Sequence, residues 1–441
     1  MAMELFVYVD LQGETHLVGT LWIHANNAGE SASFEYASEW RSSPTKFSLE
    51  PALEVGEGSF HTDAGKSLFG SIGDSAPDRW GRVLMERRES NAAKAEKRNP
   101  RLLHDSDYLL MVNDYSRQGA LRFAKTIGGP FLATATDASI PPLIDLRRLL
   151  SASERIQARQ ELEQDIKDLV DPGASLGGAR PKASVVDTNG DLLIAKFPSR
   201  NDDWDVELWE YLSFSMAARA GIPTPGTRLE KIDDKSVLIL NRFDRRDKGI
   251  RIPFLSAMSM LGYSDGDHGS YMELSEILAE CGAETTLDQK DLWRRMVFNI
   301  MISNVDDHLR NHGFLYDGSA GWRLSPLYDL EPTPEHKKVR ELHTRIDLYD
   351  GTASLDLAYS VADEFGLDAN EARKIAKEVA ESTRNWAGEA ARLGANKADI
   401  ETMSSAFDHD DLKQGLKAKV VKKSPAPKPD DEPSGSFTPR M

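Results

Sequence analysis

The sequence predicts an α+β protein with a β-rich beginning, a mixed middle and a helical end. Its 441 residues exceed what one hydrophobic core usually organises, so two or three domains are expected. Short runs of alternating apolar and polar residues, separated by turn residues, open the chain. From about residue 246 onward, apolar residues recur instead at helical spacing.

Strands and one long helix are expected in the N-terminal part. Residues 4–23 predict a strand pair that turns near Gly13, and residues 31–40 continue the strand pattern. Residues 76–98 then place apolar side chains near helical spacing, and Asn99-Pro100 stops that helix. These patterns indicate an N-terminal domain over residues 1–104.

The rest of the chain changes from mixed to helical. Strands are predicted at residues 119–125, 191–197 and 235–246, and helices at 152–171 and 205–221. Further helices are predicted at 271–282, 287–304, 354–366 and 369–394. We therefore expect a mixed domain over 105–245, a helical domain over 246–415 and a disordered tail over 416–441, where Pro, Lys, Ser and Asp replace any core pattern.

Composition excludes several classes of protein. No apolar run reaches the roughly 18 residues of a membrane span, and acidic residues come too early for a secretory signal. Cys281 is the single cysteine, which excludes an intramolecular disulfide and a multi-cysteine metal site. The net charge of −17 opposes general adhesion to nucleic acid, although it allows a local basic patch. A cytoplasmic protein is the expectation.

A glycine-rich stretch, "DPGASLGGARPKASVV" at residues 171–186, precedes a predicted strand. Glycines let backbone N–H groups approach phosphate oxygens closely, and Arg180 and Lys182 add positive charge. The stretch matches neither the Walker A pattern nor the kinase G-x-G-x-x-G pattern. A plain surface hairpin therefore stays open as the alternative.

Lys196 closes the next apolar strand, in "LLIAKFPS". A lysine in this place is typical of the kinase strand whose lysine holds nucleotide phosphates and pairs with a glutamate on a helix. Glu207 lies on a predicted helix and is the favoured partner, with Glu210 one turn further on as its rival. An edge-strand lysine that points to water is the alternative.

The stretch "ISNVDDHLRNHGFLYD", residues 302–317, contains the Asp-x-x-x-x-Asn spacing of a kinase catalytic loop. In such loops the aspartate accepts the substrate's hydroxyl proton and the asparagine binds magnesium. Five residues after Asp306 comes Asn311, whereas five residues after Asp307 comes His312. The spacing therefore selects Asp306 as the base, and Arg310 would bring positive charge to the transferred group.

A zinc site is the competing interpretation of the same stretch. His308 and His312 are four residues apart, a spacing that suits zinc on a helix. The zinc-protease pattern requires glutamate after the first histidine, where Leu309 stands, and Asn311 and Gly313 weaken a helix here. A polar turn without chemistry also stays open.

Two further segments complete the set of motifs. Asp329, in "WRLSPLYDLEPTP", follows Asn311 by 18 residues, which suits a hairpin return to the same site. A carboxylate there would hold Mg²⁺ between the β- and γ-phosphates, and a turn aspartate is the alternative. A buried strand leads into Asn241, Arg242 and Phe243, where backbone groups would face an adenine ring, and an ordinary strand end is the alternative. The order of these signals along the chain matches a bilobal kinase.

With these motifs the sequence resembles the HipA family, serine/threonine-protein kinase toxins of bacterial toxin–antitoxin modules. The resemblance spans about residues 1–400 and rests on "FEYASEW", "LFGSIGDSAPDRWGR", "DYSRQGALRF", "SLGGARPK", "ILNRFDR", "SNVDDHLRNHGFL" and "LSPLYDL". It implies an atypical bilobal protein-kinase-like fold. That fold has a mixed β/α N-lobe, a helical C-lobe and an N-terminal β-rich subdomain.

The resemblance also implies roles for individual residues. Asp306 would be the catalytic base, Asn311 and Asp329 the Mg²⁺ ligands, and Ser175 an autophosphorylation site that switches the kinase off by ejecting its loop. A phosphate there would add nearly two negative charges where the ATP phosphates sit. The implied ATP-binding residues are Gly177, Gly178, Ala179, Arg180, Pro181, Lys182, Lys196, Asn241, Arg242, Phe243, His308, Arg310, Asn311, Tyr328 and Asp329.

The same resemblance implies ATP and Mg²⁺ as cofactors and an aminoacyl-tRNA synthetase, notably the one for glutamate, as substrate. It implies a HipB-like helix-turn-helix antitoxin as partner, through which the kinase would meet operator DNA. The sequence departs from the family at Asp307, where glycine is usual, and at Arg310, where lysine is usual. Two other functions stay open: a small-molecule phosphotransferase, and a catalytically silent co-regulator of transcription.

Overall fold

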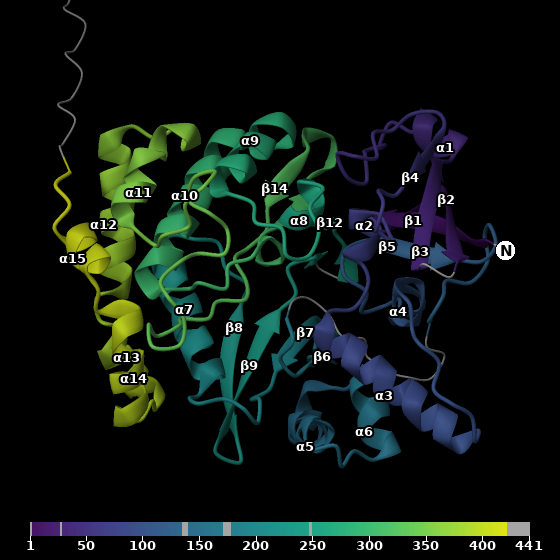
Figure 1. Ribbon diagram of the computed structural model, residues 1–441, viewed down its shortest axis with the longest axis horizontal. Helices are drawn as coiled ribbons and strands as arrows, with labels where there is room; N and C mark the ends of the chain where they lie inside the picture. Colours follow the sequence, from purple (N-terminus) through teal and green to yellow (C-terminus); the bar gives the residue numbers. More distant parts are fainter. Residues whose placement is uncertain (1, 27–28, 135–139, 171–177, 247–248, 421–441) are drawn as a thin grey trace, which may run out of the picture.

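The computed structural model of the protein describes residues 2–26, 29–134, 140–170, 178–246 and 249–420. Among the described residues, antiparallel sheets of five and four strands lie within residues 3–241 together with several helices, and helices dominate the chain after them, which confirms the predicted α+β class. In Figure 1 the N-terminal sheet lies at one end of the molecule and the C-terminal helices at the other, with a second sheet between them.

Five strands form the N-terminal sheet in the order β4-β3-β2-β1-β5, and every neighbouring pair is antiparallel. Their bounds are β1 Met3–Leu11, β2 Glu14–Asn26, β3 Gly29–Tyr36, β4 Ser59–His61 and β5 Leu121–Ala124. The predicted turn near Gly13 is confirmed, because Gln12 and Gly13 join β1 to β2 with φ angles of 52° and 90°. Two successive residues with positive φ give a turn whose twist suits a hairpin.

β5 completes this sheet from beyond the predicted boundary at residue 104. It pairs with β1 from Phe6 opposite Ala124 to Val9 opposite Leu121. The long helix α3 (Arg79–Ala95) and the short helix α4 (Asp105–Met111) lie between β4 and β5 in the chain. The N-terminal sheet therefore does not end where the composition changes.

The second sheet has the order β6-β7-β9-β8 and is also antiparallel. Its strands are β6 Lys182–Val186, β7 Leu192–Lys196, β8 Thr227–Ile232 and β9 Lys235–Asn241. One face packs against α3, α5 (Leu146–Gln157) and α6 (Glu163–Val170), through a buried cluster that includes Trp80, Leu149 and Ala195. The other face, with Ile194 and Leu238, packs against α7 (Val206–Arg219).

The single helix predicted over residues 152–171 is wrong, because two helices share that range. α5 ends at Gln157 and α6 begins at Glu163. Arg159 has a φ of 58°, a left-handed conformation that ends a helix. Asp165 then accepts a hydrogen bond from the Leu162 backbone N–H at 2.8 Å and pairs with Arg155, so a local side-chain bond begins the second helix.

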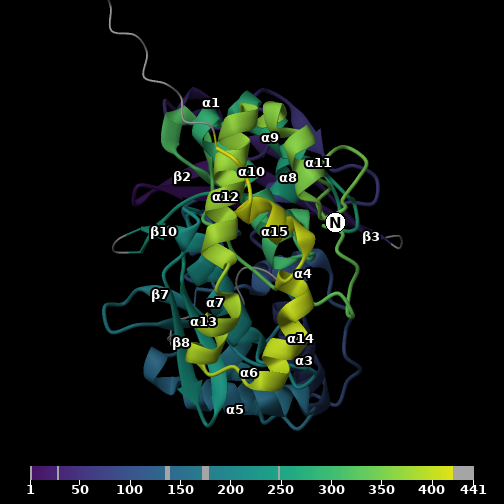
Figure 2. The same cartoon turned by 90° about the vertical axis from the view of Figure 1, so that its left-hand side faces the viewer.

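Helices dominate the C-terminal part, and its described residues also form two small sheets. The strands β12 Phe254–Ser256, β13 Gly313–Tyr316 and β14 Trp322–Leu324 form one, and β10 Arg245–Arg246 pairs with β11 Ile250–Arg251 in the other. The longer helices are α9 Tyr271–Cys281, α10 Thr285–Ile302, α12 Ala369–Thr383, α13 Trp386–Leu393 and α14 Lys397–Phe407. The short ones are α8 Ala257–Met260, α11 Leu355–Ser360 and α15 Asp410–Leu416, and the N-terminal part adds α1 Ser38–Ser42 and α2 Gly70–Gly73. Figure 2 shows α12 to α15 on the face opposite the N-terminal sheet. Among the described helices, none is long and apolar enough to cross a membrane.

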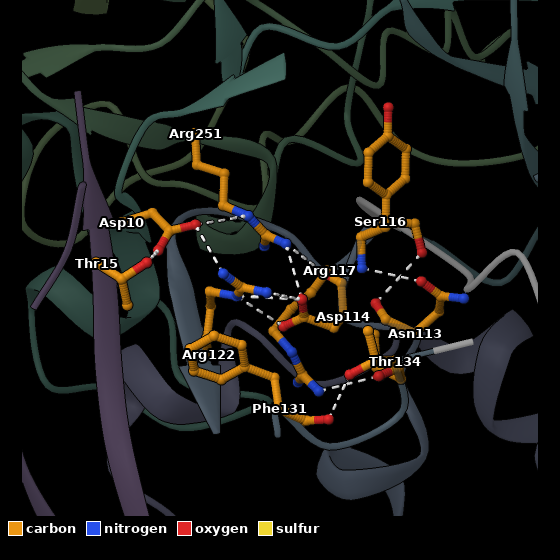
Figure 3. Close-up of polar contacts among 12 residues, drawn as sticks. Asp10, Thr15, Asn113, Asp114, Ser116, Arg117, Arg122, Phe131, Thr134 and Arg251 are labelled. Atoms are coloured by element: carbon orange, nitrogen blue, oxygen red, sulfur yellow. Dashed lines mark hydrogen bonds and ion pairs between the residues drawn. The ribbon is translucent and has the colours of Figure 1, made fainter. Parts of the chain in front are cut away.

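Largely buried charges join the N-terminal sheet to the chain segment that follows β9. We call Asp10, Asp114, Arg122 and Arg251 the junction cluster (Figure 3). Both arginines reach both aspartates, with the shortest contact 2.5 Å from Arg122 Nη2 to Asp114 Oδ2. Because the four residues come from β1, the 113–119 loop, β5 and β11, these pairs fix four segments against one another.

Candidate active site

Lys196 lies at the centre of a buried group of charges. At the end of β7, its Nζ donates to Glu210 Oε1 at 2.6 Å and to Asp329 Oδ1 at 2.7 Å. Burial lowers the pKa of this lysine, but the two carboxylates outweigh burial and raise the pKa above its usual value. The pKa of Asp329 is held well below its usual range, because Lys196 and Lys182 outweigh the effect of burial. The charged forms of both groups are thus favoured.

The expected pairing of Lys196 with Glu207 is wrong, and the rival Glu210 takes that place. Glu207 lies in the first turn of α7 and accepts instead from Arg180 Nη2 at 2.9 Å, while Asp202 accepts a two-pronged bond from the same guanidinium at 2.6 and 2.7 Å. One helical turn separates the two glutamates, so spacing could not decide between them. Arg180 is therefore held at the start of α7 by two carboxylates. The sequence instead led us to expect Arg180 as a cation free to bind phosphate.

Asp306 and Asn311 lie together in the loop after α10. Asn311 Nδ2 donates to the backbone carbonyl of Asp306 at 2.9 Å, which fixes the asparagine against the loop. The Asp306 carboxylate is about half exposed and accepts from Lys338 Nζ at 2.9 Å. Its exposure leaves it accessible to a substrate hydroxyl once the lysine moves, and an exposed pair of this kind costs only about 0–1 kcal/mol to break.

Asp307 points into the protein rather than into the site. Its carboxylate accepts from the Tyr271 hydroxyl at 2.7 Å and from the His343 backbone N–H at 2.8 Å. Burial raises its pKa to about 7, against these hydrogen bonds. The second carboxylate of the motif therefore anchors the loop.

His308 and His312 do not form a zinc pair. They flank a short 3-10 turn, Leu309–Asn311, and His312 is buried with Nε2 donating to the Asp307 carbonyl at 3.1 Å. Across the described part of the chain, no group of three or more His, Cys, Asp or Glu residues is placed to hold a metal ion. The zinc interpretation therefore has no support.

His312 predicts a pH-dependent loss of stability. Burial lowers its pKa to about 3, below the value of about 6.5 for an exposed histidine. Its contribution is fully present above pH 6.5 and is lost as pH falls toward 3, since only the unfolded chain binds the proton in that window. When pH falls from 7 to 5, we expect His312 to cost the wild-type protein about 2 kcal/mol of unfolding free energy. The variant His312→Gln should not show this loss. Urea titrations at the two pH values measure it, with the exposed His24→Gln as the control. Equal losses in wild type and His312→Gln would contradict this.

The segment expected to face adenine is partly occupied. The Asn241 N–H donates to the Gly226 carbonyl at 2.9 Å and the Arg242 N–H to the Leu192 carbonyl at 3.3 Å, because strand pairing continues past β9. The Arg242 side chain is buried against Asp244. These two N–H groups and the Arg242 side chain therefore already have protein partners, and the expectation that the segment faces adenine stays a prediction.

Aromatic residues border the site at the same segment. The Phe243 ring lies 5.4 Å from the Tyr328 ring, centroid to centroid. Tyr328 donates its hydroxyl to the Arg310 carbonyl at 2.6 Å, and the Arg310 guanidinium pairs with Asp265 at 2.7 Å. His308 Nδ1 is buried with no hydrogen-bond partner among the described residues.

The glycine-rich stretch is described only from Gly178 onward, so the expectations for Ser175 and Gly177 lie outside the described residues. Gly178 has a φ of 84°, and a Cβ there would lie 3.5 Å from both Asp329 Oδ2 and Lys182 Nζ. Ala179 is exposed, and the Pro181 carbonyl accepts from the Phe197 N–H at 2.9 Å. The loop thus places its backbone directly beside the Asp329 carboxylate.

A magnesium ion fits the residues at this site. Asn311 Oδ1 is buried with no partner among the described residues, while Nδ2 of the same amide is already bonded. Lys196 donates to Oδ1 of Asp329, so Oδ2 of the same carboxylate is free of that bond. Asp329 also has a left-handed φ of 59°, and residues in such conformations cluster at functional sites. Carboxylate and amide oxygens are the ligands that Mg²⁺ prefers.

Sequence reasoning missed Asp78, Asp202 and Lys338. Asp78 accepts from Lys182 Nζ at 2.8 Å, although the two are 104 positions apart in the chain. An aspartate before an apolar helix indicates an N-cap, and nothing in the local sequence connects it to the glycine-rich stretch.

Comparison with known proteins finds a family that part of the chain matches. Residues 174–387 match the family of the HipA-like C-terminal domain. Two proteins of Sinorhizobium fredii that are named as candidate kinases are similar to this chain. Y4mE is 25% identical over 280 residues, which cover 57% of this chain and 64% of that protein. Y4dM is 30% identical over 159 residues, which cover 33% of this chain and 38% of that protein. The chain thus spans less than two thirds of the length of either relative.

A solved structure shows the same fold. It is HipA of Shewanella oneidensis MR-1, determined with HipB and operator DNA. Its TM-score is 0.61 at 16% sequence identity, and the alignment covers 93% of this chain and 96% of that one. The HipA-like bilobal fold expected from the sequence is confirmed.

Proposed function

We propose, from the match of residues 174–387 to the family of the HipA-like C-terminal domain, that the chain is an ATP- and Mg²⁺-dependent serine/threonine-protein kinase. The observation that carries the proposal is the Lys196 pairing with Glu210 and Asp329, because a strand lysine held by a helix glutamate is the arrangement that binds nucleotide phosphates in kinases. Asn311 supplies the free amide oxygen that the same chemistry needs.

In the proposed reaction a serine or threonine hydroxyl attacks the γ-phosphorus of ATP, and the bond from that phosphorus to the bridging oxygen of ADP breaks. Asp306 accepts the hydroxyl proton, and Lys196 holds the α- and β-phosphates. Mg²⁺ bound by Asn311 and Asp329 would neutralise phosphate charge. Asp307 and His312 keep the loop in place, so that the proton acceptor and the asparagine stay on one rigid segment.

We extend the proposal to a toxin of a HipBA-like module. The similar structure from Shewanella oneidensis was determined with HipB and operator DNA, which supports a HipB-like antitoxin as partner here. The net charge of −17 favours contact with DNA mainly through that partner. The proposed substrate is an aminoacyl-tRNA synthetase such as that for glutamate, and Ser175 is the proposed autophosphorylation site.

Mass measurement tests the activity. The full chain is incubated with Mg-ATP, and its intact and peptide masses are determined. We expect a gain of one phosphate on Ser175 and none in Ser175→Ala or Lys196→Met. An unchanged wild-type mass, together with no transfer to glutamyl-tRNA synthetase, would contradict the kinase. Transfer to a small molecule alone would favour the phosphotransferase instead.

The pairing of Lys196 predicts different effects for the two glutamates of α7. Glu210→Gln removes a charged hydrogen bond to Lys196 and should lower kcat/KM for ATP by about 10- to 100-fold. Glu207→Gln is the matched control one turn away and should have a much smaller effect, because its partner is Arg180. Steady-state kinetics with varied ATP measure both, and a larger loss in Glu207→Gln would show that Glu207 is the functional partner.

A further inference from the structure

Lys182 is a buried cation at the edge of the candidate active site. It opens β6, and its side chain is 1% exposed. Its Nζ donates to Asp78 Oδ2 at 2.8 Å and to the Gly178 carbonyl at 3.3 Å. Lysine is almost never fully buried unless it is paired, so Asp78 is what allows this ammonium to lie here. An ammonium has three N–H donors. Among the described residues, the Asp78 carboxylate and the Gly178 carbonyl accept from two of them, so the third N–H is left for a ligand.

Asp78 is itself held in place. Its second oxygen, Oδ1, accepts from the Gly81 backbone N–H at 2.8 Å and caps α3. The positive end of the helix favours a carboxylate at this position. Trp80, the second residue of α3, donates a hydrogen bond from Nε1 to the Lys182 carbonyl at 3.0 Å. Both the side chain and the backbone of Lys182 are therefore fixed by the first turn of α3.

The pair lies directly beside the proposed phosphate site. A Cβ on Gly178 would lie 3.5 Å from Lys182 Nζ and 3.5 Å from Asp329 Oδ2, so the ammonium and the proposed magnesium ligand flank the same glycine. Lys182 also helps to hold the pKa of Asp329 below its usual range. α3 comes from the N-terminal part of the chain, outside the segment that matches the HipA-like C-terminal domain.

We propose that Asp78 is a positioning residue for the nucleotide site: it holds the Lys182 ammonium against Gly178, where its free N–H meets a phosphate oxygen of ATP. The inference rests on the proposed kinase function. It assigns to the N-terminal domain one carboxylate on which nucleotide affinity depends. Asp78 touches no substrate and acts through Lys182 alone.

Substitutions that keep the helix cap test this in the full chain. Asn caps helices as well as Asp does, so Asp78→Asn preserves α3 and removes the charge that holds Lys182. We expect KM for ATP and the calorimetric Kd for Mg-ATP to rise by about tenfold, with kcat changed less than twofold, since one charged hydrogen bond is lost. The same change at the exposed cap of α12, Asp368→Asn, is the matched control and should leave both values unchanged.

A double-mutant cycle separates positioning from a structural role. If Asp78 acts through Lys182, Asp78→Asn adds nothing to the rise in KM caused by Lys182→Met. Asp78→Glu is the second variant, in case Asp78→Asn fails to fold. It keeps the charge and leaves no buried lysine unpaired, but it moves the carboxylate by one methylene, so it should raise the KM for ATP. Unchanged or lower KM in a folded Asp78 variant, or additive effects in the cycle, would overturn the inference and leave the kinase standing. A wild-type chain that does not bind Mg-ATP would overturn both.

Discussion

Asp306→Asn should lower the rate of phosphoryl transfer by about 10²- to 10⁴-fold and leave the Kd for Mg-ATP within about twofold of wild type. The reason is that the Asp306 carboxylate is half exposed and does not hold Lys196 or Asn311 through its side chain. Its removal therefore takes away the proton acceptor and leaves the proposed nucleotide contacts intact. Single-turnover transfer to Ser175, with calorimetry for binding, measures the two quantities separately.

Asp203→Asn is the matched control for this change. Asp203 is also an exposed carboxylate, and it pairs with Lys337, the neighbour of the lysine that pairs with Asp306. Removing it breaks the same kind of surface pair without removing the proposed base, so activity should stay within about twofold. Asp306→Asn with wild-type activity would show that another group takes the proton.

Asp244→Asn should destabilise the protein by about 3–5 kcal/mol. The Asp244 carboxylate is fully buried and accepts from Arg242, from Arg245 and from the Gly119 N–H at 2.8 Å. These partners outweigh burial and hold its pKa well below the usual range. Its contribution is therefore present above the unfolded value of about 3.9 and is lost as pH falls below it. Asn leaves two buried arginines without their counter-charge.

Urea unfolding at pH 7 measures this loss. The matched control is Asp317→Asn, since Asp317 pairs with Arg246 across 3.7 Å with both side chains at least half exposed. That pair should contribute about 0–1 kcal/mol. Similar losses for the two variants would show that burial does not strengthen the Asp244 interactions. Arg246, the partner of Asp317, lies two residues after Asp244 in the segment that follows β9, so a difference reflects burial rather than location.

The sequence predicted β1, β2 and α7 well because their signals are local, whereas the single helix predicted over residues 369–394 is two helices, α12 and α13. Alternating residues gave β1 and β2, and helical spacing with Gly221 gave α7, which Gly221 follows with a φ of 78°. The spacing in "DDHLRN" also selected the aspartate and asparagine that the structure brings together. In each case the deciding residues lie within a few positions of one another.

Long-range pairing could not be predicted in the same way. Glu207 and Glu210 lie one turn apart on the same helix, and only the packing of α7 on the sheet decides which one meets Lys196. Asp78 and Lys182 meet through tertiary structure across 104 positions. The break between α5 and α6 was missed because the left-handed Arg159 ends one helix and the bond from the Leu162 N–H to the Asp165 side chain begins the next, although the residues around them favour helix.

The late position of β5 has a consequence for how the chain folds as it is made. β1 to β4 leave the ribosome first, but the outer edge of β1 has no partner until residues 121–124 follow. An unpaired strand edge is a template for pairing with another chain. β1 must therefore wait for α3 and α4 to be synthesised before it is paired on both sides, and during this interval its open edge is exposed to aggregation.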